Sequence, residues 1–453
     1  MSFALDRRTT VQLGLAALGA SFLTACSGSG SDGGEPQAEP TAPGGDDAIE
    51  LVSSGVRRAA GDPALVPDVV AGLHTFAGRL YDALAREHRG DNLVLSPFSV
   101  LVALGMTLTG AAGRTATEMR EVLGVGDLGE RWHQGVNALT RSLEGLAGEQ
   151  KRLDGSTAEL ALATADQLFG QKGVAWEREF VDLLAKEYGA PVRAVDFVEH
   201  TEQSRRLIND WVEEQTADRI VDLVPEGVLD PATRLVLVNA IYLKAPWESP
   251  FEKTLTARGA FRRVDGKVVQ ADLMRVPDLA ARLTSGTGWR AVAVPYAGRR
   301  LAMTIVLPDE PGGLAGVEHQ VASGGLAAFT PAGESGETTG VDLTLPRWTF
   351  RTAAPLREVL VGLGMPAAFG DGADFTPMTE EDLDLVVSEV LHQAFVAVDE
   401  EGTEAAAATA VVMTETSAPL TEPFVVDRPF LFVVHDVAHG TPLFVGRVTD
   451  PTA

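Results

Sequence analysis

The stretch DEEGTEAAAATAVVMTETSAPLTEPF occupies residues 399–424 and has an unusual composition. It follows a predicted strand, Phe395–Val398, yet it has no proline before Pro419 and no bulky side chain anchors its first dozen residues. Four consecutive alanines favour a helix, whereas Thr409 and Val411 favour a strand. This composition is typical either of a flexible surface loop or short helix, or of an exposed segment that can later become a strand.

A segment that is exposed now and joins a sheet later must satisfy two physical conditions. It must lack proline, because each proline removes a hydrogen-bond donor from the strand ladder. It must also carry small side chains where it enters between close-packed strands. Residues 402–418 meet both conditions, so the sequence is compatible with later insertion into a sheet.

The composition limits the classes of protein to which the chain can belong. Of its 453 residues, 45% are hydrophobic and 22% are charged, values typical of a globular protein with a core. The formal net charge of −26 argues against nucleic-acid binding, because a field of that sign repels phosphate groups. The single cysteine excludes an intrachain disulfide and a zinc site built from several cysteines.

The pattern of apolar residues predicts an α+β fold. Helical spacing predicts a helix over residues 67–88, and Ser99 is expected to cap a second helix. Residues 235–243 form a continuous apolar run, and residues 430–434 with 443–448 predict a hairpin. Because helices dominate the first half and strands the second, the pattern favours an α+β fold over repeated βαβ units.

The N-terminus has the pattern of an export signal. Residues 1–26 contain Arg7 and Arg8, an apolar run too short to span a bilayer as a helix, and small residues before Cys26. This pattern resembles a bacterial lipoprotein signal, in which the cysteine is lipidated. A plain secretory peptide is the alternative, and the paired arginines match a twin-arginine signal only loosely. Residues 27–64, rich in glycine, serine, proline and acids, are predicted to be a disordered tether.

The expected location follows from this assignment. The protein is exported, and it is either attached to the outer face of a membrane through its lipid alone or secreted. No other segment of the sequence is long and apolar enough to predict a membrane span.

No motif carries convincing catalytic or metal-binding chemistry. Residues 124–129 fit GxGxxG but follow a predicted helix instead of a strand, so they predict a loop. His435 and His439 lie at a predicted strand end and turn, where their spacing does not bring two ligands together. Ser335 lies in a sequence that differs from GxSxG. We therefore predict a protein that is not an enzyme and that uses no metal and no cofactor.

Short motifs that occur in order along the chain indicate a family. Gly402, Thr403 and Glu404 precede Ala405, Ala406, Ala407 and Ala408, and this run resembles the proximal hinge of the reactive-centre loop in the serpin family of serine protease inhibitors. Other serpin-like motifs lie at residues 92–99, 208–212, 237–244 with Trp247, 294–296, 303–308, 343–348, 363–375, 392–395 and 427–432.

The resemblance covers residues 67–453 and implies a fold. That fold is a single α+β domain, here residues 65–453, with three β-sheets and eight to nine helices. It also has an exposed reactive-centre loop, which would occupy about residues 400–424.

The resemblance also implies a mechanism of inhibition. In this family a protease attacks the loop and forms an acyl-enzyme through its own nucleophile. The freed half of the loop then enters the largest sheet as a new central strand and distorts the attached protease. Glu400 and the run that begins at Gly402 would be the hinge, and its small residues favour an active inhibitor. A serpin-fold binding protein without inhibition is the alternative, and a hydrolase is a third, weaker hypothesis.

The position of the reactive bond is expected by counting from the hinge. Fourteen residues beyond Gly402 place the bond between Thr416 and Ser417, so that Thr416 is the P1 residue; Glu415 and Met413 are the alternatives for P1. Thr416 would suit serine proteases with a small apolar or broad pocket, such as elastase-like or subtilisin-like enzymes. Glu415 would imply a Glu-specific protease and Met413 a chymotrypsin-like one. Cysteine proteases are a further class of target, and the inhibitor is expected to be a monomer.

Other family positions can be carried over with their roles. Ser96, Ser99, Asn239 and His392 match a polar cluster beneath the sheet that opens, although ordinary buried polar packing is a second interpretation. Trp247 matches an aromatic residue near the point of insertion. The chain departs from the family at residue 166, where an aspartate replaces the usual asparagine. A buried unpaired carboxyl there would lower stability.

Overall fold

The computed structural model describes residues 49–333, 337–381, 383–403 and 421–453. Within these ranges the chain folds into eight α-helices and two sheets, which confirms the predicted α+β class. The helices are α1 (Val66–Glu87), α2 (Pro97–Leu108), α3 (Gly113–Leu123), α4 (Trp132–Glu144), α5 (Arg178–Tyr188), α6 (Thr201–Gln215), α7 (Leu314–Ala322) and α8 (Arg357–Leu363). Short 3-10 helices are η1 (Pro63–Leu65), η2 (Gly126–Arg131), η3 (Lys253–Leu255), η4 (Gly325–Phe329), η5 (Pro366–Phe369) and η6 (Thr376–Met378).

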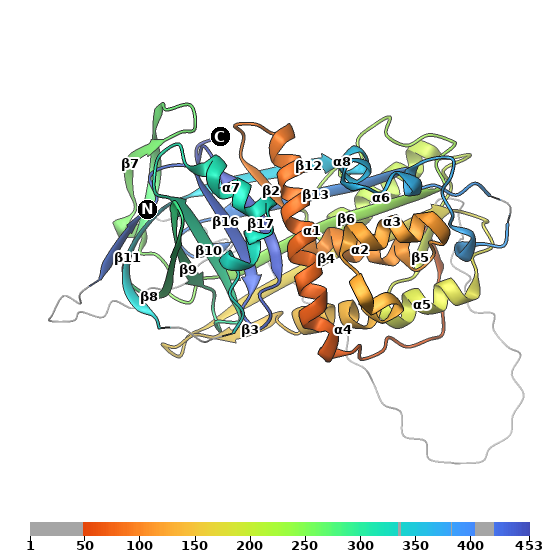
Figure 1. Cartoon of the computed structure of the whole chain (residues 1–453), viewed down its shortest axis with the longest axis horizontal. Helices are drawn as coiled ribbons and strands as arrows, with labels where there is room; N and C mark the ends of the chain where they lie inside the picture. The colour runs from red at the N-terminus through yellow and green to blue at the C-terminus, as the bar shows by residue number, and fades with distance from the viewer. Residues whose placement is uncertain (1–48, 334–336, 382, 404–420) are drawn as a thin grey trace, which may run out of the picture. The chain divides into compact units, whose positions relative to one another are not determined.

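The first sheet has eight strands. They are β1 (Glu50–Val52), β3 (Gly148–Lys151), β4 (Thr157–Gln171), β5 (Val192–Val195), β6 (Leu235–Pro246), β12 (Trp348–Pro355), β13 (Glu389–Val398) and β14 (Gly402–Thr403). Their order is β1-β5-β4-β6-β14-β13-β12, and β3 pairs with β4. Figure 1 shows the long strands β4, β6, β12 and β13 running side by side beneath the helices.

The second sheet has nine strands in the order β15-β11-β8-β9-β10-β16-β17-β2, with β7 paired to β8. The resemblance implied three sheets, but two of them are continuous here. The reason is that the long strand β8 pairs with β7 and β11 along most of its length and with β9 at its end. The strands are β2 (Leu93–Leu95), β7 (Ala257–Arg262), β8 (Val268–Gly286), β9 (Trp289–Pro295), β10 (Leu301–Pro308), β11 (Thr339–Pro346), β15 (Glu422–Val425), β16 (Phe430–Asp436) and β17 (Pro442–Val448).

Strand β6 is largely apolar because both of its faces are buried. Val236 and Val238 belong to a small core beside α6, whereas Leu237 and Ile241 belong to the main core on the opposite face. Successive side chains of a strand point to opposite faces, so Asn239 lies on the main-core side, where α2 packs against β4 and β6. The predicted apolar run is therefore a central strand with one polar residue directed at α2.

Two of the local sequence predictions are confirmed and one is wrong. The helix predicted at 67–88 is α1, and the predicted C-terminal hairpin is the antiparallel pair β16 and β17. The predicted cap of α2, Ser99, is wrong by one turn, because Ser96 is the N-cap. The Ser96 hydroxyl accepts a hydrogen bond from the Ser99 amide at 3.3 Å, and Pro97 starts the helix. Proline suits that first position because it has no amide hydrogen to leave unpaired.

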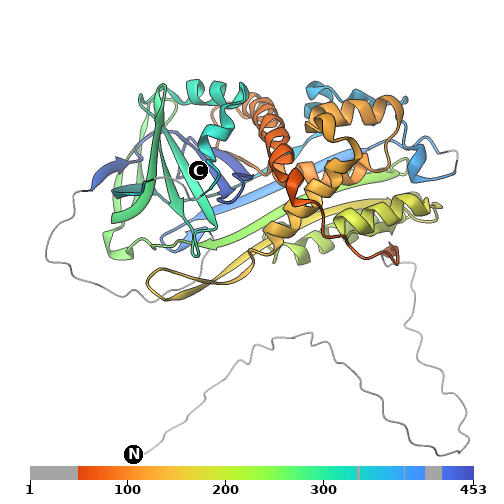
Figure 2. The same ribbon diagram turned by 60° about the horizontal axis from the view of Figure 1, so that its bottom comes forward.

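Residues 50–62 correct the boundary of the predicted tether, because they pack against the domain. Strand β1 pairs with β5, with Glu50 opposite Ala194 and Val52 opposite Val192. Farther along, the Ala59 amide donates to the carbonyl of Lys186 at 2.7 Å and the Asp62 amide to that of Gln134 at 3.0 Å. Figure 2 shows this segment passing below α4 and α5 to the start of α1. The first sheet therefore has an additional edge strand from the N-terminal segment.

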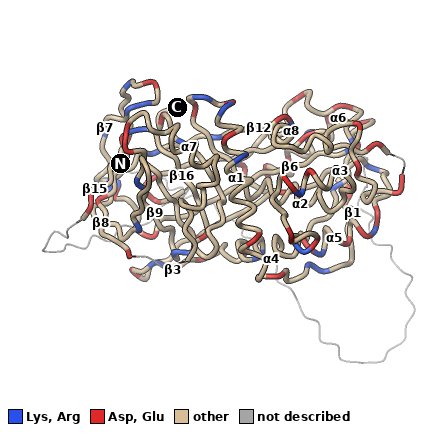
Figure 3. The backbone as a smooth tube through the Cα atoms, in the orientation of Figure 1, with Lys and Arg blue, Asp and Glu red and all other residues tan. Residues whose placement is uncertain are grey.

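Figure 3 shows both basic and acidic residues in many parts of the backbone, with neither sign confined to one region. In the part of the chain that the structure describes, none of the helices combines the length and apolarity that crossing a membrane requires.

Candidate functional site

The predicted hinge begins inside the first sheet. Gly402 and Thr403 form β14, which lies between β6 and β13: Gly402 is opposite Pro246, and Thr403 is opposite both Ala245 and Val398. Glu404 and the four alanines that follow, Met413, Glu415 and the Thr416–Ser417 bond lie outside the described residues. What the structure describes is therefore a strand of two residues between β6 and β13.

Gly402 is required for close backbone contact at this position. A Cβ atom placed on it would lie 2.3 Å from the carbonyl oxygen of Ala245 and 2.6 Å from the Cα of Pro246. Both obstacles are backbone atoms of β6, which cannot move aside as a flexible side chain can. Only glycine fits beside β6 here.

Thr403 is held by a pair of stacked aromatic rings. Its hydroxyl hydrogen bonds with the Tyr296 hydroxyl at 2.6 Å, and Tyr296 stacks on Trp247 with ring centroids 4.5 Å apart and planes 6° apart. Trp247 in turn donates from Nε1 to the carbonyl of Asp399 at 3.0 Å. Burial raises the pKa of Tyr296 well above its ordinary value, so its hydroxyl stays neutral. Trp247 thus lies beside the turn that leads into β14. Tyr296 is a contact of Thr403 that the sequence motif at 294–296 contained but did not reveal.

The acidic turn before β14 is fixed by paired carboxylates. The Asp399 carboxylate accepts hydrogen bonds from the amides of Glu401 at 2.8 Å and Gly402 at 3.2 Å, although burial raises its pKa. Glu401 pairs with Lys253 at 2.6 Å. Glu400 accepts from the Thr256 hydroxyl at 2.7 Å and lies 3.6 Å from Arg347. These contacts hold the chain at the end of β13 as it turns back into the sheet.

Beyond β14 the sheet closes, because β6 and β13 pair directly. This parallel pairing runs from Glu389 opposite Val236 to Ala394 opposite Ile241. A strand that continued from Thr403 would have to separate these residues. His392 is opposite Asn239 within this stretch, so the predicted polar cluster lies where the two strands would part.

Ser96, Ser99, Asn239 and His392, the four predicted cluster residues, lie together. A series of hydrogen bonds connects them, and each residue donates to the next. The Ser96 amide donates to Nε2 of His392 at 3.1 Å, so that nitrogen is an acceptor and Nδ1 carries the proton toward Oδ1 of Asn239. Burial lowers the pKa of His392 to about 4, which keeps the ring neutral. The amide nitrogen of Asn239 then donates to Ser99 Oγ and to Asp166 Oδ1.

Asp166 is the last acceptor of this chain of hydrogen bonds. It also accepts from the Ser99 hydroxyl at 3.2 Å. The sequence left open whether a carboxyl at this position would be unpaired, and the structure answers that it is paired. We define the polar cluster by its five residues, which are Ser96, Ser99, Asp166, Asn239 and His392.

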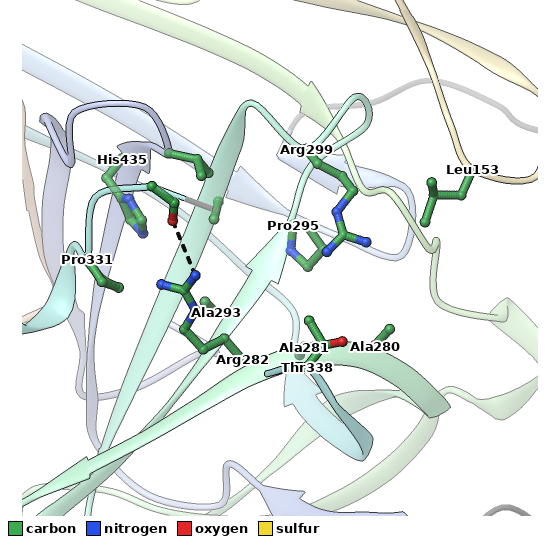
Figure 4. A pocket seen from close by; sticks show the side chains of 13 residues that line it. Leu153, Ala280, Ala281, Arg282, Ala293, Pro295, Arg299, Pro331, Thr338 and His435 are labelled. Atoms are coloured by element: carbon green, nitrogen blue, oxygen red, sulfur yellow. Dashed lines mark hydrogen bonds between the residues drawn. The ribbon is translucent and has the colours of Figure 1, made fainter. Parts of the chain in front are cut away.

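A separate pocket over the second sheet was a place to look for the groups that a hydrolase would use. It has a volume of about 340 Å³ and lies over β8, β9 and β10 (Figure 4). Arg282, Arg299 and His435 line it with small apolar residues, but the described residues of its lining include no serine, cysteine or carboxylate. His435 is bonded instead to the Thr304 hydroxyl at 3.0 Å. Ser335 lies outside the described residues.

Comparison with known proteins agrees with this geometry. A family model described as serpin (serine protease inhibitor) matches residues 71–451. Serpin B4 of Homo sapiens is 36% identical over 373 residues, covering 81% of this chain and 95% of that protein. Leukocyte elastase inhibitor of Sus scrofa is 36% identical over 385 residues, covering 83% of this chain and 98% of that protein.

A solved structure extends the likeness to three dimensions. Serpin48 of the insect Tenebrio molitor superposes with a TM-score of 0.73 and 31% sequence identity, and the match covers 86% of this chain and 99% of that one. The family match, the relatives and the fold agree over nearly the whole described domain. The chain therefore belongs to the serpin family.

Proposed function

We propose that the protein inhibits extracellular serine proteases by offering its loop as a substrate and then inserting the cut loop into its first sheet. The observation that supports this most strongly is β14. Gly402 and Thr403 already occupy the first positions of a strand between β6 and β13. The residues that would follow are Glu404 and four alanines, whose small side chains oppose insertion little.

The covalent step uses the chemistry of the protease. The serine oxygen of the protease attacks the carbonyl carbon of Thr416, the bond to the Ser417 nitrogen breaks, and that nitrogen leaves as an amine with the proton from the serine. The ester that remains joins the protease to the new C-terminus at Thr416. Hydrolysis of this ester would free the protease, so insertion must be faster than deacylation.

The dimensions of the sheet suit such an insertion. Thirteen steps separate Thr403 from Thr416, about 43 Å of extended strand at roughly 3.3 Å each. Strand β6 has 12 residues, which is eleven steps and about 36 Å by the same measure. The new strand gains hydrogen bonds to β6 and β13 on both sides, each worth about 0.5–1.5 kcal/mol net. It replaces only the single ladder between Val236–Ile241 and Glu389–Ala394.

The P1 residue proposed at Thr416 favours targets with a small apolar or broad specificity pocket, of the elastase-like or subtilisin-like kind. The likeness to a leukocyte elastase inhibitor supports this choice. Glu415 and Met413 remain the alternatives for P1, and each predicts a different protease.

The direct test mixes the full mature chain with pancreatic elastase and, separately, with subtilisin. We expect a complex that survives SDS and one cut between residues 413 and 418, mapped by mass spectrometry. The cut, inserted form should melt at a much higher temperature than the intact form. Cleavage without a complex and without that rise would mean a serpin-fold protein that is a substrate only.

Thr403→Arg should convert the inhibitor into a substrate. Thr403 is 3% exposed and bonds to Tyr296, and a cation there would lose several kcal/mol of solvation, so complex formation should fall by about tenfold or more. Thr403→Ser, which keeps the hydroxyl, is the matched control. SDS gels of both variants with elastase measure the ratio of complex to cleaved product, and equal ratios would refute insertion through this residue.

Gly402→Ala should expel β14 from the sheet, because its new Cβ would collide with the backbone at Ala245 and Pro246. Amide hydrogen exchange should then quicken at residues 245–247 and 398–403. Gly372→Ala is the control, since a Cβ there would have no neighbour within 4 Å. Unchanged protection in Gly402→Ala would mean that β14 is not held as described.

We also propose that Cys26 is lipidated and holds the mature protein at the outer face of a membrane; residues 1–26 lie outside the described part of the chain. The support is the short apolar run with small residues directly before the only cysteine. Cys26→Ser should move the protein from the membrane fraction of the expressing cells to a soluble fraction and abolish labelling by radioactive palmitate. Equal partition and labelling of the variant would contradict lipidation.

A further inference from the structure

We propose that the pocket over the second sheet binds a small organic anion, a carboxylate with a short aliphatic chain, whose charge is held by Arg282 and Arg299. The pocket has a volume of about 340 Å³, at the lower end of the range for small-molecule sites. Its size therefore favours a small ligand over a peptide. Binding there does not depend on the proposed inhibition, because none of the described lining residues lies in a strand of the first sheet.

The floor of the pocket is one face of the second sheet. Pro295 of β9, Ala302 of β10 and His435 of β16 lie opposite one another in a single row. Ala293 precedes Pro295 by two residues, so it lies on the same face, and it is opposite Arg282 of β8. The two alanines carry only a methyl group, which leaves space above the strands for a ligand.

His435 contributes a flat, uncharged wall to this floor. Its Nδ1 donates to the carbonyl of Asp436 at 3.3 Å, and its Nε2 accepts from the Thr304 hydroxyl at 3.0 Å. Burial lowers the pKa of the ring to about 4, so the ring is neutral at physiological pH. The positive charge of the described lining therefore comes from Arg282 and Arg299.

The two arginines lack a charged partner among the described residues. Arg282 donates to the carbonyl of Gly333 at 3.2 Å, which engages one of the five N–H donors of its guanidinium. Neither arginine forms an ion pair within the described ranges. In Figure 4, Arg282 rises from β8 and Arg299 descends from the turn between β9 and β10. Both side chains are half-buried, so water would screen their attraction for a bound anion only in part.

The turn that carries Arg299 is held in a strained conformation. Arg299 has a φ of 57°, in the left-handed region that residues with a Cβ atom rarely adopt. The turn is fixed by the buried Glu248, whose carboxylate accepts from the amides of Gly298 at 3.1 Å and Leu153 at 2.6 Å. Because Leu153 also lines the pocket, one carboxylate holds two parts of the lining in place. Strained residues cluster at ligand clamps, which is the role we assign to Arg299.

A carboxylate with an aliphatic chain matches both parts of the pocket. Guanidinium N–H groups bind carboxylate oxygens through charge-assisted hydrogen bonds, often in pairs. The aliphatic part would lie on the apolar floor, where each buried methylene strengthens binding by up to about fourfold. The protein carries a formal net charge of −26, so a pocket whose described lining is cationic and holds no acidic side chain departs from the rest of the molecule and selects anions.

Isothermal titration calorimetry of the full mature protein with sodium octanoate tests the site without any protease. We expect one site, with an affinity that increases from butanoate to hexanoate to octanoate. 1-Octanol, which has the same number of carbons and no charge, should bind at least about tenfold more weakly. Octylammonium should not bind, and added NaCl should weaken octanoate binding because salt screens the attraction between the charges.

Two variants each remove one charge from the pocket. Arg299→Gly removes the guanidinium and relieves the left-handed backbone, so it should keep its fold and yet bind octanoate about tenfold more weakly. Arg282→Gln should weaken binding by a similar factor. Arg258→Gln is the matched control, because it removes the same charge from an exposed position of β7 outside the pocket. It should bind octanoate as the wild type does.

Three results would overturn the proposal. They are no detectable binding of octanoate, equal affinity for octanoate and 1-octanol, and wild-type affinity in both Arg299→Gly and Arg282→Gln. The calorimetry uses uncut protein alone, so its outcome is separate from that of the proposed inhibition. If no protease complexes form, the inhibition fails and the titrations still decide whether the anion site exists.

Discussion

The structure depends on one contact, the pairing of β6 with β13. These strands complete the first sheet by pairing directly, and the proposed insertion would require them to separate. Two features meet at their boundary. At one end, Gly402 and Thr403 already lie between the strands. Farther along, Asp166, Asn239 and His392 form a row across the part of the sheet in which β6 and β13 pair directly. Apolar packing alone would make this boundary tight but would give it no directional, breakable contact.

Different contacts occur at the two parts of this boundary, which we call the open end, where β14 lies between β6 and β13, and the closed part, where β6 and β13 pair directly. At the open end, close contact with the backbone of β6 leaves no room for a Cβ atom at Gly402. The Tyr296 hydroxyl hydrogen bonds with the hydroxyl of Thr403, the next residue. In the closed part, each hydrogen bond depends on the orientation of the one before it, from the Ser96 amide to the carboxyl of Asp166. A change at either end of that chain would alter all of its members, so the effects of substitutions in the polar cluster should not be additive.

Those parts of the fold and the candidate site in which a local sequence pattern reflects burial were predictable. The run at 235–243 predicted a strand because β6 is covered on both faces, and short motifs located Ser96, Ser99, Asn239, His392 and Trp247. Contacts between distant residues were not predictable from spacing. The ion pairs of Glu400 and Glu401 with Arg347 and Lys253 join residues far apart in sequence. The three-residue strand β1 was hidden in a segment whose composition predicts a tether.

The position of β1 places the N-terminal segment at one end of the first sheet. Through successive pairs, Glu50 is in line with Ala194, Gly170 and Leu235, which is the first residue of β6. The hinge lies beside Pro246, at the other end of the same strand. An inserted strand that started at the hinge would run along β6 toward Leu235, which lies in the row from which the N-terminal segment departs. The N-terminal edge strand and the hinge therefore lie at opposite ends of the first sheet.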